Sequence, residues 1–122
     1  MSIIQGLTKI ILYVTDMKKQ VHFYRDVLDL AVKYPAGLDD YSQEIWVEFE
    51  TGECILALHV KEEQLGGSKP KLAFHVNDIE AAHKTLTERG AKLSNIVSRS
   101  LGLKIADGFD PEGNPFAIES PV

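Results

Sequence analysis

The sequence contains a single cysteine, Cys54, among its 122 residues. An intrachain disulfide, a redox pair and a thiolate metal cluster all need more than one cysteine, so the sequence excludes each of them. Cys54 alternates with Leu56 and Leu58 along a predicted strand. We therefore interpret it as a small apolar core residue rather than as a nucleophile.

Long apolar runs and an excess of positive charge are also absent. No segment approaches the roughly eighteen consecutive apolar residues of a transmembrane helix. The N-terminal segment lacks the basic stretch and apolar core of a signal peptide. A formal net charge of −5 disfavours nucleic acids and anionic membranes, which bind basic patches. We therefore expect a cytoplasmic protein with no nucleic-acid partner and no membrane partner.

The sequence does contain an internal repeat. Residues 9–17, Lys-Ile-Ile-Leu-Tyr-Val-Thr-Asp-Met, return as residues 71–79, Lys-Leu-Ala-Phe-His-Val-Asn-Asp-Ile. A second echo relates Phe49 and the following Leu56-Ala57-Leu58 to Phe109 and the following Phe116-Ala117-Ile118. An internal repeat indicates that one structural unit is built twice.

Each copy begins with an alternating apolar segment that is followed by an aspartate and a helical pattern. Thr15 or Asp16 is predicted to cap the first helix, and Asp78 the second, which runs through Arg89. Gly90 and Asp29 follow these helices, and both residue types tolerate the left-handed backbone that ends a helix. The predicted strands cover residues 7–14, 30–34, 43–50, 54–60, 71–76, 91–97, 103–109 and 114–120.

These elements predict an α+β fold made of two tandem βαβββ modules. We expect one domain over residues 1–122, with module one at about 7–60, a linker at 61–70 and module two at about 71–120. The modules are expected to form a curved mixed sheet around a concave cleft, with the helices on its outer face. Residues 110–113, Asp-Pro-Glu-Gly, predict a type I turn before the last strand.

Strand alternation assigns residues to the two faces of the predicted sheet. The helix side receives apolar residues that include Ile45, Val47 and Phe49. The opposite side is unusually polar, which favours a solvent-filled binding cleft, although an exposed sheet face explains the same lining. The cleft-facing residues that we predict to bind a ligand are Lys9, Tyr13, Trp46, Glu48, His59, Lys71, His75 and Glu119.

The duplicated strand–Asp–helix units, the helical segment 23–28 (Phe-Tyr-Arg-Asp-Val-Leu) and the closing segment 110–114 together resemble the vicinal oxygen chelate superfamily. This group contains glyoxalase I, extradiol dioxygenases, methylmalonyl-CoA epimerase and the fosfomycin and bleomycin resistance proteins. The resemblance covers about residues 7–120. It implies the two-module fold and, in members that perform metal chemistry, four metal-ligand positions.

Those four positions fall on Lys9, Ala57, Lys71 and Ala117 in this chain. Alanine has no donor atom, and a protonated lysine offers hydrogens but no lone pair to a metal. The metals of this superfamily need imidazole nitrogen or carboxylate oxygen at these places. We therefore predict that no metal and no other cofactor is bound at the inherited site.

Several interpretations of the cleft residues stay open. Lys9 and Lys71 could hold an anion between them, or they could extend into water from the strand ends. His59, His75 and Glu119 could form a displaced metal site, although strand rise separates the two histidines unfavourably. Hydrogen-bonded pairs that act as general acid or base are a further alternative. Trp46 with Glu44 and Glu48 suits a flat or cationic ligand, or it could be a core or dimer contact.

The resemblance is greatest to the metal-free bleomycin resistance proteins, which bind a small molecule without transforming it. It implies a small-molecule-binding protein that sequesters a drug or metabolite, and a homodimer, because these relatives are dimers. We favour this function over catalysis. The alternative is a glyoxalase-like lyase, epimerase or dioxygenase that uses a displaced metal site or the acid and base residues of the cleft. An interaction domain with an empty cleft is a third possibility.

Overall fold

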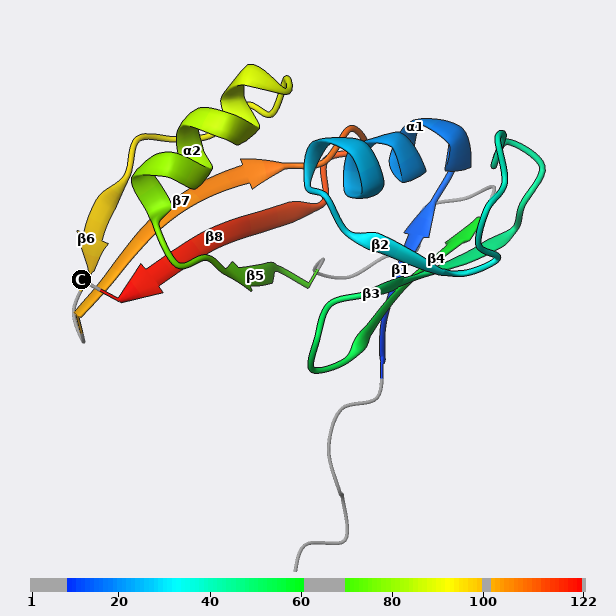
Figure 1. Cartoon of the computed structure of the whole chain (residues 1–122), viewed down its shortest axis with the longest axis horizontal. Coiled ribbons are helices and arrows are strands. Elements are labelled where there is room, and N and C mark those ends of the chain that lie inside the picture. Colours follow the sequence, from blue (N-terminus) through cyan, green and yellow to red (C-terminus); the bar gives the residue numbers. More distant parts are fainter. Residues whose placement is uncertain (1–8, 61–69, 100–101, 122) are drawn as a thin grey trace, which may run out of the picture. The chain divides into compact units, whose positions relative to one another are not determined.

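The computed structural model describes residues 9–60, 70–99 and 102–121 (Figure 1). The chain divides into two compact units, Met1–Leu65 and Gly66–Val122. The predicted linker at 61–70 lies almost entirely outside the described residues. Each unit is therefore considered by itself, and the cleft between the modules stays a prediction.

Each unit contains one open four-stranded mixed sheet. In the first, strand order is β1-β4-β3-β2, and in the second it is β5-β8-β7-β6. The outer strands β1 and β5 pair in parallel with β4 and β8, and all other pairs are antiparallel. The strands are β1 Lys9–Val14, β2 Ala31–Tyr34, β3 Trp46–Glu50, β4 Ile55–Val60, β5 Leu72–His75, β6 Val97–Arg99, β7 Leu103–Phe109 and β8 Pro115–Pro121. The predicted α+β fold with two βαβββ modules is confirmed.

The two helical segments begin at equivalent aspartates. Asp16 accepts a hydrogen bond from the backbone N–H of Lys19 at 3.0 Å, and Asp78 accepts one from Ala81 at 3.1 Å. These contacts satisfy one of the N–H groups that a helix start leaves without an intrahelical partner. Of the two candidate caps in the first module, Asp16 is the one that forms this bond.

The first helical segment changes its winding after one turn. It consists of α1 (Met17–Val21) and a π-helix, η1 (His22–Val27), in which the Leu28 N–H donates to the Phe23 carbonyl at 2.9 Å. Asp29 then has a φ of 68°, so the predicted left-handed residue is confirmed. The second segment is the regular helix α2 (Ile79–Glu88), which Gly90 follows with a φ of 102°.

The apolar side of each sheet packs under its own helix. In unit one the ring of Tyr24 lies 6.0 Å from that of Phe49, and both side chains are fully buried. In unit two α2 lies over β7 and β8 (Figure 1). Burial of this apolar area, at about 25 cal/mol per Å², is the main term that stabilises each unit. The other core residues include Leu12, Val14, Val21, Val47, Leu56, Leu58, Leu72, Ile79, Ala106, Phe116 and Ile118.

The echo between Phe49 and Phe109 is not a structural equivalence, although both phenylalanines lie near the end of a strand. Phe49 pairs with Leu56 and is buried, whereas Phe109 pairs with Pro115 and is 65% exposed. The residue that pairs with Phe116, the counterpart of Leu56, is Gly108. A Cβ atom at Gly108 would lie only 3.0 Å from the Phe116 ring, so in unit two the Phe116 side chain leaves no room for a large side chain there.

Two predicted strands are wrong in their extent. Of residues 91–97 only Val97 is in a strand; Leu93 forms a single bridge with Gly108, and Asp107 N donates to the hydroxyl of Ser94 at 2.9 Å. The Ser94 hydroxyl thus accepts a hydrogen bond that a backbone carbonyl would accept in a continuous strand pair, and this interrupts the pairing of the two segments. The strand predicted at 43–50 begins only at Trp46, and Ile45, expected on the helix side, is 68% exposed.

The predicted turn at 110–113 is present and is fixed by a buried aspartate. The Gly113 N–H donates to the Asp110 carbonyl at 2.9 Å. The Asp110 carboxylate accepts from the backbone N–H groups of Glu112 and Asn114 and from the Asn114 amide, at 2.8–2.9 Å. These three donors explain how an acidic side chain can be buried. Among the described residues, no helix is both long and apolar enough to cross a membrane.

The Asp78 cap generates a stability prediction. Asp78→Ala removes the acceptor for the Ala81 N–H and is expected to lower the free energy of unfolding by about 1 kcal/mol. Urea denaturation followed by circular dichroism measures this loss. The matched control is Asp78→Ser, which keeps a capping oxygen and should stay within a few tenths of 1 kcal/mol of the parent. Equal losses in both variants would contradict the capping role.

Candidate functional site

Each unit has an ion pair that crosses its central strand. In unit one the Lys9 ammonium lies 3.7 Å from Glu48, and in unit two the Lys71 ammonium lies 2.5 Å from Asp107. The lysine lies on one side of that strand, at β1 or before β5, and the acid lies on the other side, on β3 or β7. Glu48 pairs with Ala57 on β4, and Asp107 pairs with Ala117 on β8. The two ion pairs are therefore equivalent under the internal repeat.

Both alanines between these partners are fully buried. With Lys9 and Lys71 they are the four positions that the sequence comparison assigned to a metal. The donor set does not fit one, because the alanines have no donor atom and each lysine already faces a carboxylate of its own unit. Within the described residues, no group of three or more His, Cys, Asp and Glu side chains is placed to hold a metal ion.

Three rings lie side by side on the same face of the first sheet. Tyr13 and Trp46 are the two strand partners of His59, and their ring centroids lie 5.7 and 5.4 Å from it. We call Tyr13, His59 and Trp46 the aromatic row. Strand alternation places the row on the side opposite the buried Val47 and Phe49. Tyr13 is 41% exposed, so part of this aromatic surface is accessible.

Trp46 is held in place by the ion pair beside it. Its indole Nε1 donates to Glu48 Oε2 at 2.9 Å, and the Lys9 ammonium lies 5.4 Å from the centroid of its ring. Glu48 thus accepts from an N–H and faces an ammonium at the same time. Unit one brings together five of the predicted ligand-binding residues: Lys9, Tyr13, Trp46, Glu48 and His59.

The equivalent layer of unit two has different chemistry. His75 pairs with Glu119, in the place of Tyr13 and His59, and Ile105 takes the place of Trp46. The Nε2 of His75 lies 3.1 Å from the Asn77 amide oxygen, a hydrogen bond in which the imidazole N–H is the donor. The described contacts of unit two give it no aromatic row. Of the other three predicted residues, Lys71 directly precedes β5, His75 lies on β5 and Glu119 lies on β8.

Asp107 is a site residue that sequence reasoning did not identify. The echo between Phe49 and Phe109 aligns Glu48 with Gly108 and so hides the acidic partner of Lys71. The hairpin of unit two is one residue longer, and this shifts the true counterpart of Glu48 to Asp107. The signal that could have revealed it was the repeat of the lysine itself, since an acidic partner of Lys9 predicts an acidic partner for Lys71 at the equivalent place.

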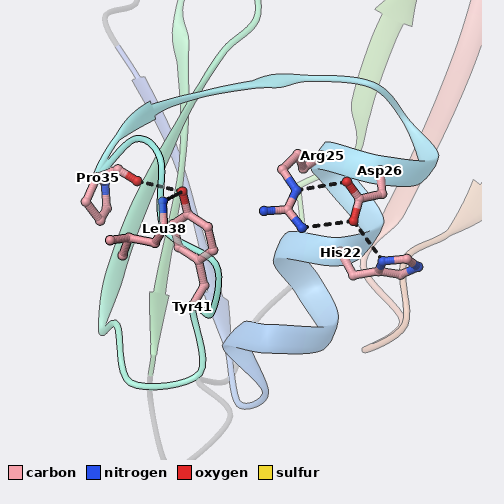
Figure 2. A network of polar contacts seen from close by, with 6 residues as sticks. All are labelled: His22, Arg25, Asp26, Pro35, Leu38 and Tyr41. Carbon is pink, nitrogen blue, oxygen red and sulfur yellow. Dashed lines mark hydrogen bonds and ion pairs between the residues drawn. The ribbon is translucent and has the colours of Figure 1, made fainter.

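A second polar cluster lies on the helix side of unit one (Figure 2). Arg25 donates to both carboxylate oxygens of Asp26 at 2.8 and 3.0 Å, and His22 Nδ1 lies 2.9 Å from the same carboxylate. The Arg25 guanidinium is also 5.6 Å from the centroid of the Tyr41 ring. None of these residues is among the ligand-binding residues predicted from the sequence. The contact between Arg25 and Tyr41 connects η1 to the loop that follows β2.

The hydrogen bond from Arg25, together with that from His22, lowers the pKa of Asp26 below its usual 3.8. A carboxylate with a lowered pKa stabilises the fold above its unfolded-state pKa and loses that contribution as the pH falls through the folded value. We expect Asp26→Asn to lose less stability than the parent on acidification from about pH 5 to pH 2. The effect should stay below about 1 kcal/mol, because the pair is exposed to solvent. Urea titrations at each pH measure this effect, and Glu88→Gln is the control for the loss of one negative charge. If the free energy of unfolding changed with pH equally in Asp26→Asn and the parent, the role of Arg25 would be contradicted.

The contact between Trp46 and Glu48 can be measured separately, since Trp46 is the only tryptophan of the sequence. Glu48→Leu removes the acceptor of the indole N–H, whereas Glu48→Gln keeps a carbonyl oxygen in its place. We expect Glu48→Leu to shift the emission maximum and to lower the stability by about 1 kcal/mol, the cost of an orphaned polar group. Glu48→Gln should keep the parental emission. The same emission in parent and Glu48→Leu would show that the bond is not maintained in solution.

Comparisons with known proteins agree with this topology. The family model of the Glyoxalase/Bleomycin resistance protein/Dioxygenase superfamily matches residues 6–118. A solved structure of TnmS3, an antibiotic-binding protein from Streptomyces sp. CB03234, is similar with a TM-score of 0.78, 21% identity and full coverage of both chains. A putative glyoxalase family protein from Bacillus anthracis gives a TM-score of 0.78 at 13% identity, covering 100% of this chain and 99% of its own.

A lactoylglutathione lyase from Agrobacterium tumefaciens is also similar, with a TM-score of 0.72 and 18% identity over 95% of this chain and 93% of that one. At such identities the solved structures show the fold alone. No curated protein matches the sequence. The family model, by contrast, covers nearly the whole chain and both repeats. The chain therefore belongs to the Glyoxalase/Bleomycin resistance protein/Dioxygenase superfamily.

Proposed function

We propose that this chain is a metal-free small-molecule-binding protein that sequesters a drug or metabolite. The ligand contacts the aromatic row of unit one. Lys9 and Glu48 border the row, and Lys71, His75 and Glu119 are the further ligand-binding residues that we propose in unit two. As the family resemblance implies, the protein acts as a homodimer, and it works in the cytoplasm. The single observation that carries the proposal is the replacement of all four metal-ligand positions by two lysines and two alanines.

The ion pairs support binding without a metal. In each unit, a divalent cation at these positions would meet an ammonium group and would have to draw its carboxylate, Glu48 or Asp107, away from it. Neither alanine offers a replacement ligand. The same pairs also weaken the case for an anion held between the two lysines, because each ammonium already faces a carboxylate. Each ion pair consists of one ammonium and one carboxylate, so its net charge is close to zero.

The aromatic row supports a flat ligand. The rings lie 5.4 and 5.7 Å apart between centroids and are tilted by 65° and 41°, so a planar molecule can stack on one of them while the others contact its edge. Glu48 fixes the Trp46 indole by a hydrogen bond, so less side-chain freedom is lost when a ligand binds. Because the neighbouring charges compensate each other, we favour a flat, weakly charged aromatic molecule over a strongly charged one. TnmS3, which has the same fold, is described as an antibiotic-binding protein.

The competing function is catalysis by a lyase, epimerase or dioxygenase of the superfamily. One observation favours it: the His75 Nε2 lies 3.1 Å from the Asn77 amide oxygen, a hydrogen bond that orients the imidazole as the partner of a general acid or base would. The similarity to a lactoylglutathione lyase is one of fold. Metal dependence separates the two functions, because an ion that binds only the native state raises its melting temperature.

We expect planar aromatic natural products to quench or shift the Trp46 emission in a saturable way and to raise the melting temperature of the full chain. Trp46→Ala should weaken binding by about tenfold, the loss expected for about 1.4 kcal/mol of stacking. Trp46→Phe, which keeps a ring, should retain most of the affinity, and thermal shift measures the affinity of both variants. Phe109→Ala is the matched control, since it removes an exposed ring of unit two outside the row.

Two results would contradict the proposal. The first is a saturable rise in melting temperature with zinc, nickel, manganese or iron, accompanied by stoichiometric metal in the purified protein. The second is equal affinity of the parent and Trp46→Ala for every compound that binds. The expected result is no metal response together with ligand binding that depends on the ring at position 46.

A further inference from the structure

The two oxygens of the Glu48 carboxylate have different surroundings. The Trp46 indole N–H donates to Oε2 at 2.9 Å, and the Lys9 ammonium lies 3.7 Å from the same atom. Within the residues that the structure describes, no hydrogen bond reaches the other oxygen, Oε1. The protein therefore engages one oxygen of this carboxylate and leaves the other available.

The available oxygen is accessible and lies beside the aromatic row. The Glu48 side chain is 17% exposed, and Oε1 is not among the buried side-chain oxygens without a partner in the described part of the chain. Residues two apart on a strand share a face, so Glu48 stands on the same face as Trp46. Since the indole N–H points outward from the ring edge, the carboxylate that accepts from it lies at that edge. A flat molecule on the row would therefore have an acceptor at its border.

A carboxylate at this place can distinguish between ligands. It accepts hydrogen bonds but donates none. A ligand N–H or O–H at the ring edge would form a charge-assisted bond with Oε1, roughly twice as strong as a bond between neutral groups. A ligand ether or carbonyl oxygen at the same place would instead direct its lone pairs at a negative oxygen. Two ligands with the same ring but opposite hydrogen-bonding character should therefore differ in affinity.

The other polar groups beside the row do not make this distinction. A neutral imidazole has one donor and one acceptor nitrogen, so His59 can accommodate either kind of ligand. The Lys9 ammonium faces Oε2, and an anion that approached it would also meet the negative charge of Glu48. The hydrogen bond to the indole fixes Glu48, whereas Lys9 is held only by an ion pair and a ring contact. Directional selection therefore falls to Glu48.

We propose that Glu48 is the specificity-determining residue of the aromatic row, and that it selects flat, neutral aromatic molecules with an N–H or O–H group at their edge. The donor forms a hydrogen bond with Oε1 while the ring contacts the row. This inference rests on the proposed function, because the ligand must lie on the row. It adds the hydrogen-bonding class of that ligand.

Three small bicyclic probes test the selection at neutral pH. Indole carries one N–H, benzofuran has an oxygen in its place, and isoquinoline has a ring nitrogen that only accepts. Each probe is titrated into the full-length, isotope-labelled chain, and the indole N–H signal of Trp46, the only tryptophan, is followed with the backbone amides. We expect all three to shift this signal in a saturable way, and indole to bind about tenfold more tightly than benzofuran.

Glu48→Gln should reverse the preference. Its amide oxygen is expected to take the place of Oε2, toward the Trp46 N–H and the Lys9 ammonium, so the NH₂ group takes the place of Oε1. The ratio of the indole and isoquinoline affinities should then change by about tenfold in favour of isoquinoline. Glu50→Gln is the matched control: it removes a negative charge from the same strand, where Glu50 lies 3.7 Å from Lys33, and should keep the parental ratio.

The outcomes separate this inference from the proposed function. If indole and benzofuran shifted the Trp46 signal with equal affinity in the parent, the inference would be overturned while binding on the row would stand. An unchanged ratio of the indole and isoquinoline affinities in Glu48→Gln would have the same meaning. If none of the probes shifted the signal, the proposed function would fail, and the inference with it.

Discussion

The parallel pairing of the first and last strand in each unit is the constraint on which the rest depends. Parallel neighbours cannot be joined by a tight hairpin, so the chain must cross over through a helix and return through two further strands. This route puts the last strand in the centre of the sheet, between the strand that carries the lysine and the strand that carries the acid. A lysine and a carboxylate can then meet across a central alanine in both units.

The size of the central residue decides what this arrangement can hold. Ala57 and Ala117 contribute no donor and little bulk, so the long lysine side chain can extend toward the acid on the far strand. The pairs are partly exposed, with side-chain exposures of 39% and 17% in unit one, and such pairs contribute only about 0–1 kcal/mol to stability. Their main effect is electrostatic. Each carboxylate compensates the charge of a lysine at a position that the family resemblance assigns to a metal ligand. In unit one the pair also orients the Trp46 ring.

Much of this fold could be predicted from the sequence, because the repeat is marked by residues with a clear physical role. The helix caps Asp16 and Asp78 and the left-handed Asp29 follow from local backbone chemistry. The failures occur where a long-range contact overrides a local pattern. Ser94 interrupts a strand with its side chain, and the longer hairpin of unit two turns the apparent Phe109 counterpart of Phe49 into an exposed residue. An offset of one residue places a side chain on the opposite face of the sheet, and strand alternation alone does not reveal such an offset.

The aromatic row and the polar cluster on the helix side differ in how far the sequence could predict them, because the first comes from strands and the second depends on a loop. The aromatic row comes from regular strands, so alternation placed Tyr13, Trp46 and His59 on one face correctly once the strands were known. The polar cluster on the helix side depends on Tyr41, which lies in an irregular loop where no periodicity applies. Its burial follows from two hydrogen bonds within the loop and from the Arg25 guanidinium above its ring, and none of these contacts leaves a repeating pattern in the sequence. A loop that buries a large aromatic side chain against a paired arginine is ordered by its own contacts, so a segment that the sequence describes only as a turn has a defined conformation in the structure.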